Sequence, residues 1–188
     1  MNKVKQVLLS SLLVLVTSNV FALPLITGTM EMGGGFNPID SRGNVTTADA
    51  ATGIDFTFFG FDMFETTFSD GDFAGLTGQL GNITDFQFDP FMAPIANFWS
   101  IDIFSFELTD VARGFTNDPT NFLILEGEGI ISAAGFADTQ AAWNFSGDTS
   151  GGGVFSWSAV SVVNNVPEPS VLVLLAAGLL GFGLRKKV

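Results

Sequence analysis

The sequence predicts an all-β fold, either an antiparallel β-sandwich or a flattened barrel, with an N-terminal signal helix and a short C-terminal transmembrane helix. Three observations predict this class. Residues 23–165 contain short stretches in which apolar and polar residues alternate, broken by Gly, Asn, Asp and Ser, which is typical of strands and turns. No stretch of these residues that is long enough to form a helix has helical periodicity. The two ends of the chain are instead continuous apolar runs with basic residues beside them.

Three segments show the alternation most clearly, namely residues 53–59, 82–88 and 98–108. In the first and third segments apolar residues alternate with polar ones, and in the second Thr84, Phe86 and Phe88 share one face, as expected of strands with one buried face. In the third segment the parity changes at Ile103 and Phe104, where two apolar residues are adjacent. This change predicts a bend, either a β-bulge or a strand that crosses between two sheets.

Four further strands are predicted at residues 122–126, 129–133, 141–146 and 154–162. The last two are expected to form a hairpin across the Gly-rich segment between them. Its aromatic residues would face the same side of the sheet: Trp143, Phe145, Phe155 and Trp157.

The composition excludes several function classes. The chain has 188 residues, of which 47% are hydrophobic and 21 are Phe, enough apolar surface for one packed domain. It has no Cys and no His, which removes disulfides, thiol nucleophiles and imidazole bases, and residues 23–165 have no Lys for Ser-Lys chemistry. The chain is therefore predicted not to be an enzyme. Only Arg42 and Arg113 are basic in that range, which contains every acidic residue except Glu168, so nucleic-acid binding is not expected.

Residues 1–22 have the pattern of a secretory signal peptide. Lys3 and Lys5 precede an apolar run at residues 7–16, and small residues lead to a predicted cleavage site after Ala22. The alternative is an N-terminal anchor or a core helix. The apolar run is too short to cross a membrane about 30 Å thick, so export is favoured.

The other end of the chain has three parts in fixed order. A Val-Pro-Glu-Pro-Ser box at residues 166–170 precedes an apolar run at residues 171–184, and a basic tail follows at residues 185–188. The run has no polar face and would rise about 21 Å as a helix, so it is a short membrane span that the flanking basic residues can help to position. By the positive-inside rule the tail stays in the cytoplasm, which places the acidic body on the exported side. The basic residues of this tail are Arg185, Lys186 and Lys187.

This arrangement resembles the sorting signal of the PEP-CTERM proteins, exported proteins of Gram-negative bacteria that are often biofilm formers. The resemblance rests on the box Val166, Pro167, Glu168 and Pro169, together with the apolar run and the basic tail. It implies three regions: a signal peptide (1–22), an acidic β-rich mature domain (23–165) and a sorting signal (166–188). It also implies recognition by an exosortase in the inner membrane, after use of the export machinery. A plain C-terminal tail anchor is the alternative.

Two carboxylates in the mature domain are candidate metal ligands. Asp70 and Asp72 are two residues apart in a Ser-Asp-Gly-Asp turn, and carboxylate oxygens are the ligands that Ca²⁺ prefers. No EF-hand pattern surrounds them, so a solvated turn is the alternative that the sequence favours. No other cofactor is predicted.

The tryptophans allow two interpretations. Trp99, Trp143 and Trp157 could stack on sugar rings, but each alternates strictly with polar neighbours, which favours burial in the core. The sequence therefore predicts an exported surface or extracellular matrix protein with a structural or adhesive role, linked to exopolysaccharide or biofilm. The alternative is a lectin-like, carbohydrate-binding β-sandwich module assisted by Ca²⁺. In either case the precursor would be held transiently in the inner membrane before the body reaches the outer surface or the matrix.

Overall fold

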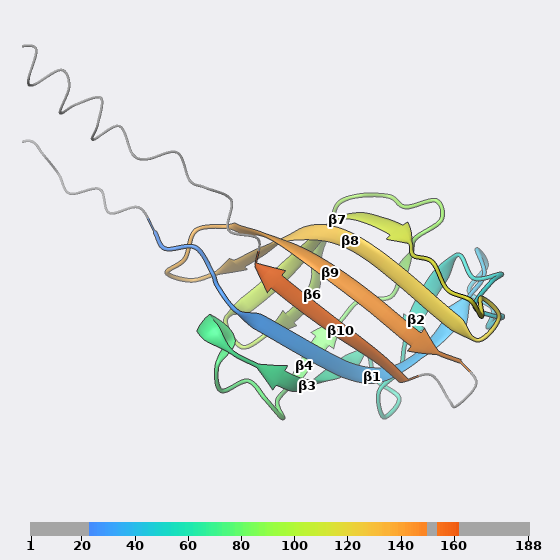
Figure 1. Cartoon of the computed structure of the whole chain (residues 1–188), viewed down its shortest axis with the longest axis horizontal. Coiled ribbons are helices and arrows are strands. Elements are labelled where there is room, and N and C mark those ends of the chain that lie inside the picture. The colour runs from blue at the N-terminus through green and yellow to red at the C-terminus, as the bar shows by residue number, and fades with distance from the viewer. Residues whose placement is uncertain (1–22, 150–153, 162–188) are drawn as a thin grey trace, which may run out of the picture.

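The computed structural model describes residues 23–149 and the backbone of residues 154–161. The described chain forms ten strands and one turn of 3-10 helix (Figure 1). In chain order these elements are β1 (Thr29–Ile39), β2 (Gly53–Phe56), β3 (Met63–Ser69), η1 (Gly71–Phe73), β4 (Leu80–Ile83), β5 (Phe86–Gln87), β6 (Ile95–Ile101), β7 (Phe104–Arg113), β8 (Phe122–Ala133), β9 (Thr139–Asp148) and β10 (Val154–Ser161).

Antiparallel pairing joins the strands in the order β10-β9-β8-β7-β6-β4-β3-β1-β2-β5. In addition, β10 pairs with β1, so the hydrogen-bonded neighbours from β1 through β3, β4, β6, β7, β8 and β9 to β10 form a closed cycle. The far half of β1 leaves this cycle and pairs with β2, which in turn pairs with β5. Figure 1 looks onto β1, β10, β9 and β8, with β6 behind them.

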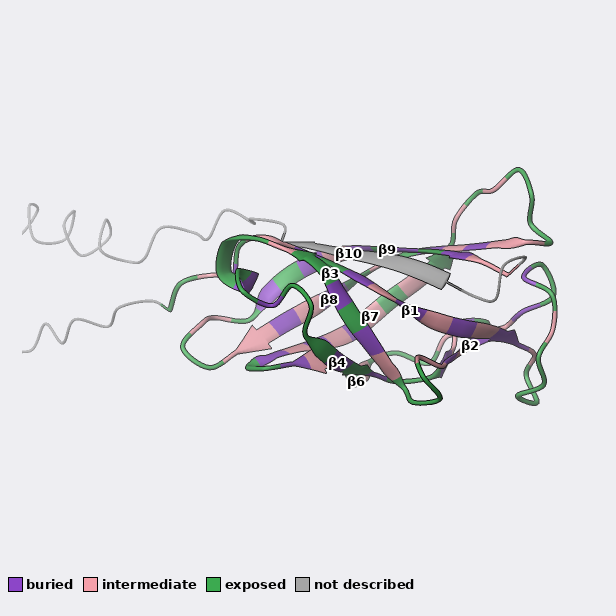
Figure 2. Cartoon of the chain, turned by 90° about the horizontal axis from the view of Figure 1, so that it is seen from below, coloured by how far each residue is buried: buried purple, intermediate pink, exposed green. Residues whose placement is uncertain are grey.

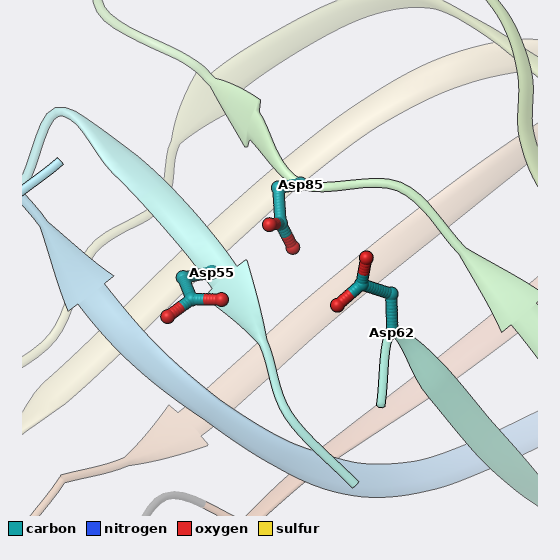
Figure 3. A group of neighbouring side chains, drawn as sticks. All are labelled: Asp55, Asp62 and Asp85. Carbon is teal, nitrogen blue, oxygen red and sulfur yellow. The ribbon is translucent and has the colours of Figure 1, made fainter. Parts of the chain in front are cut away.

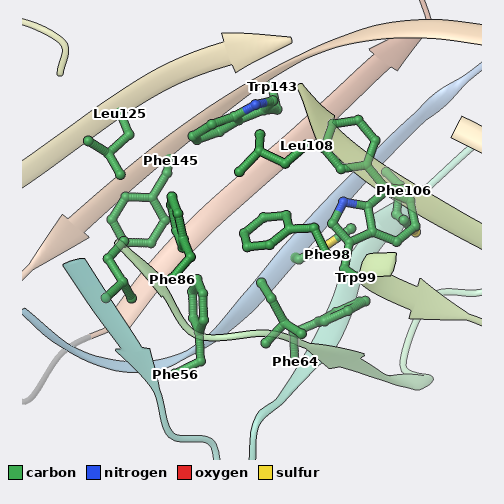
Figure 4. Close-up of a cluster of buried hydrophobic side chains, with 14 of the residues drawn as sticks. Phe56, Phe64, Phe86, Phe98, Trp99, Phe106, Leu108, Leu125, Trp143 and Phe145 are labelled. Atoms are coloured by element: carbon green, nitrogen blue, oxygen red, sulfur yellow. The ribbon is translucent and has the colours of Figure 1, made fainter. Parts of the chain in front are cut away.

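The core lies inside this curved sheet, and phenylalanine is its most frequent residue. The strands alternate between buried and exposed positions, as Figure 2 shows for β3, so one face of each strand supplies the interior. The aromatic rings touch edge to face or stacked: Phe86 and Phe98 have centroids 5.0 Å apart, and Trp99 stacks on Phe106 at 5.4 Å. The largest fully buried side chains, several of which Figure 4 shows, are Trp99, Trp143, Phe56, Phe64, Phe73, Phe98, Phe106 and Phe145.

The predicted all-β antiparallel class is confirmed. The strands that β-alternation predicted at 53–59, 141–146 and 154–162 correspond to β2, β9 and β10, and the last two pair as a hairpin with Trp157 opposite Phe145. The two strands predicted at 122–126 and 129–133 are one continuous strand, β8, because Gly127 extends along the sheet rather than turning the chain.

Two other predicted strands are wrong because each is interrupted in the structure. Residues 82–88 are two strands, β4 and β5, that pair with different partners, because the chain leaves the first ladder at Thr84 and Asp85. Residues 98–108 do not bend at a bulge: they cross a hairpin in which Ile101 pairs with Phe104. The two residues of the turn, Asp102 and Ile103, shift the apolar positions from one parity to the other. Asp102 takes a φ of 50°, as tight hairpin turns require.

No helix among residues 23–149 and 154–161 is long and apolar enough to cross a membrane. The predicted signal helix (1–22) and transmembrane helix (171–184) lie outside the described residues.

Candidate functional site

Three aspartates from separate parts of the sequence meet at one place on the body. Asp55 lies on β2, Asp62 directly precedes β3, and Asp85 lies between β4 and β5. One carboxylate oxygen from each lies within 4.8 Å of the others (Figure 3). We call Asp55, Asp62 and Asp85 the carboxylate cluster.

The strand ladders bring these residues together. Ile54 pairs with Phe86, which places Asp55 beside the β4–β5 connection, and the Ile83 N–H donates to the carbonyl of Asp62 over 3.0 Å. Two hydrogen bonds then hold individual carboxylates. The Phe56 N–H donates to Asp85 Oδ1 over 2.7 Å, and Asn37 Nδ2 donates to Asp55 Oδ2 over 3.3 Å.

The charges of the cluster repel one another. Partial burial raises the pKa of Asp85, and although the Phe56 N–H opposes this, the charges of Asp62 and Asp55 raise it further. Such a group has two ways to lower its energy: it can take up a proton, or a cation can neutralise it. Oxygens on opposite sides of a Ca²⁺ ion lie about 5 Å apart, twice the usual 2.3–2.6 Å bond, so the spacing within the cluster is compatible with one shared divalent ion.

An aromatic hairpin leads directly into this cluster. Phe58 and Phe61 pair across a tight turn in which Phe59 has a φ of 53° and Gly60 a φ of 82°. A left-handed backbone is rare for a bulky residue, and Phe59 is also 84% exposed. The ring centroids of Phe58 and Phe59 are 4.4 Å apart, so the hairpin presents a pair of aromatic rings beside Asp62.

The predicted metal ligands Asp70 and Asp72 lie elsewhere, around η1. Asp70 Oδ1 accepts a hydrogen bond from the Thr29 N–H over 2.5 Å. Asp72 Oδ2 accepts two from Thr27, from its N–H over 2.7 Å and from its hydroxyl over 3.1 Å. Both carboxylates therefore fasten the segment that leads into β1. Calcium binding at this pair stays a prediction, and among the described residues the geometric grouping of carboxylates falls instead on the cluster.

Two of the three tryptophans pack in the core. Trp99 and Trp143 are 0% and 1% exposed, which confirms their place in the core and makes a sugar-stacking platform built on them wrong. The side chain of Trp157 lies outside the described structure, although its backbone is part of β10.

The remaining predicted site residues are at the two ends, outside the described residues: Ala22, the box Val166, Pro167, Glu168 and Pro169, and the tail Arg185, Lys186 and Lys187. The structure shows at which end of the body the described chain starts and stops. The start of β1 and the end of β10 are adjacent, with Thr29 opposite Val160, so both described ends leave the body at the same end of the sheet (Figure 1).

An antiparallel β-body between a signal peptide pattern and a tripartite terminal signal defines the class: an exported protein that is processed at the membrane. Comparison with family models places it further, since residues 165–187 match the model of the PEP-CTERM protein-sorting motif. The chain thus carries the PEP-CTERM sorting motif that its C-terminal residues predicted, and the match lies outside the β-body. No curated protein and no solved structure matches the chain.

Proposed function

We propose that this chain is a non-catalytic structural or adhesive protein of the outer surface or extracellular matrix, deposited by exosortase processing and associated with exopolysaccharide in a biofilm. The single observation that carries the proposal is the sorting motif at residues 165–187, which implies recognition by an exosortase and delivery toward the cell surface. The signal peptide pattern at residues 1–22 supplies the entry to the export machinery.

The character of the body supports a role outside the cell. It encloses a dense aromatic core without any cysteine, so its stability does not depend on the redox state of its surroundings. Its strong excess of carboxylates over Arg42 and Arg113 keeps it soluble and repels polyanions. Association with an acidic exopolysaccharide would therefore require bridging cations, whereas association with a neutral one would not.

The test uses the full chain in a host with and without an exosortase. We expect a shortened product at the surface or in the medium only when the enzyme is present. The variant with Pro167, Glu168 and Pro169 all changed to Ala should stay at full length in the membrane fraction. Pro119→Ala, in the exposed β7–β8 connection, is the matched control and should be processed normally. Equal products with and without the enzyme would refute the proposal.

A second candidate function is supported by the carboxylate cluster and the aromatic hairpin beside it. We propose as the alternative a lectin-like module that holds a carbohydrate with the help of Ca²⁺. Carboxylates that hold a cation also accept hydrogen bonds from sugar hydroxyls, and the exposed Phe59 ring offers an apolar face.

Thermal unfolding with and without Ca²⁺, together with a glycan array, separates the two candidates. The module predicts that Ca²⁺ raises the melting temperature and that Asp62→Asn abolishes the rise. Asp102→Asn, which removes one charge at a turn where Asn is also tolerated, should leave it unchanged. If Ca²⁺ has no effect and no glycan binds, the structural role stands alone.

A further inference from the structure

Strand β10 is the last strand of the body and is paired on both of its edges. Residues 154–160 pair with β1, from Val154 opposite Gly35 to Val160 opposite Thr29. On the other edge, residues 154–161 pair with β9 along the whole strand. Without β10, both β1 and β9 would present an unpaired edge, so this strand completes the sheet. The closed cycle of strands therefore requires the chain as far as Ser161.

The N-terminal segment is fixed at the same end of the sheet. The Ala137 N–H donates to the carbonyl of Pro24 over 2.8 Å, and the Ile26 N–H donates to Thr139 Oγ1 over 2.9 Å. Ile26 itself is fully buried. The chain is thus held against the body from Pro24 onward, close to the predicted cleavage site after Ala22.

The chain between the body and the sorting signal is short. Ser161 ends β10, and the sorting match begins at residue 165. Residues 162–166 before Pro167 can span at most about 17 Å, and residues 162–170 before the apolar run at most about 30 Å, at roughly 3.3 Å for each residue. The twelve residues of β8 alone extend about 40 Å. A body tethered by a connection shorter than its own strands cannot turn freely above the membrane.

We propose that the sorting signal is cut from an already folded body, held with one end toward the membrane, and that the number of residues between Ser161 and Pro167 sets whether the processing enzyme can reach its motif. The end in question carries Pro24, η1 and the β8–β9 connection. Because β10 is paired on both sides, it cannot lend residues to the connection without opening the sheet. This proposal rests on the proposed exosortase processing.

The experiment compares variants of the full chain in the host that contains the exosortase. Deleting residues 162–165 removes about 13 Å of reach. Because a misplacement of about 1 Å can cost a reaction up to about 100-fold, we expect processing to fall at least tenfold. Replacing the same four residues by Gly-Ser-Gly-Ser keeps the length and should keep processing at the wild-type level. Adding Ser158→Pro to the deletion removes a donor from the doubly paired strand, frees its end and should restore processing.

Three outcomes of this experiment would contradict the proposal. Processing of the deletion variant at the wild-type rate would overturn the proposal. So would loss of processing in the Gly-Ser variant, which would show that residue identity matters and not length. Failure of Ser158→Pro to restore cutting would show that pairing of β10 is not what limits reach. If the wild-type chain itself is never shortened in this host, the proposed function fails, and that result is separate from all three.

Discussion

Truncating Phe106 tests how strongly the body depends on its aromatic core. This side chain is 0% exposed, and its ring stacks on Trp99 with planes only 10° apart. It also lies against β8, where a Cβ on Gly129 would meet the ring at 2.1 Å, so Gly129 has no side chain that could fill the space. Phe106→Ala should therefore leave a cavity.

The magnitude follows from the area that the ring buries. A ring of about 150 Å² at about 25 cal/mol per Å² corresponds to about 4 kcal/mol, within the 3–5 kcal/mol typical of buried Phe→Ala changes. For a domain of this size such a loss lowers the melting temperature by about 10–15 °C. The assay is denaturant and thermal unfolding of the purified mature protein, followed by tryptophan fluorescence.

The control for this change is Phe115→Ala, because that ring is 83% exposed. Its unfolding free energy should stay within about 0.5 kcal/mol of the wild type. If Phe106→Ala also costs less than about 1 kcal/mol, the packing described for the core would be refuted.

Three further predictions concern charge and backbone fit. Burial and neighbouring charges raise the pKa of Asp85, so its ionised form destabilises the fold. Asp85→Asn keeps the acceptor for the Phe56 N–H and should therefore stabilise the protein at pH 7. In pH-dependent denaturation this gain should disappear below the ordinary aspartate pKa of about 4. A gain that persists at low pH would contradict this. Asp72→Ala should weaken the attachment of Thr27, costing about 1–2 kcal/mol and speeding hydrogen exchange near residue 27, whereas unchanged exchange would speak against that role. Gly129→Ala brings a methyl group against the Glu107 carbonyl and the Phe106 ring, and should cost about 1–3 kcal/mol by denaturant unfolding; a neutral result would show that β7 and β8 are not so closely packed.

Local alternation predicted those strands whose buried face carries large apolar residues. β2 and β9 follow this pattern: β9 extends two residues beyond the predicted strand at each end, whereas β2 ends at Phe56, three residues before the predicted end. β1 was not predicted, although it is central to the sheet, because Gly33, Gly34 and Gly35 have no side chains and Pro38 argues against a strand. Its pairing with β2, β3 and β10 depends on the whole fold rather than on its own residues.

The sites differ in the same way. The sorting signal is contiguous, so its box, apolar run and basic tail can be recognised from the sequence, and the family model matches them. The carboxylate cluster combines residues 55, 62 and 85, and no spacing rule connects them before β2, β4 and β5 are paired. Asp70 and Asp72 looked like a metal pair because they are only two residues apart in sequence. In the fold they instead hold Thr29, the first residue of β1, and Thr27 just before it.

The most direct test of the whole account is the intact mass of the protein isolated from its native culture. Exosortase sorting predicts a chain that begins near Leu23 and ends near the Val166–Glu168 box, without the apolar run or the basic tail. A surface protein that still ends in Arg185, Lys186 and Lys187 would contradict processing and leave only a membrane anchor.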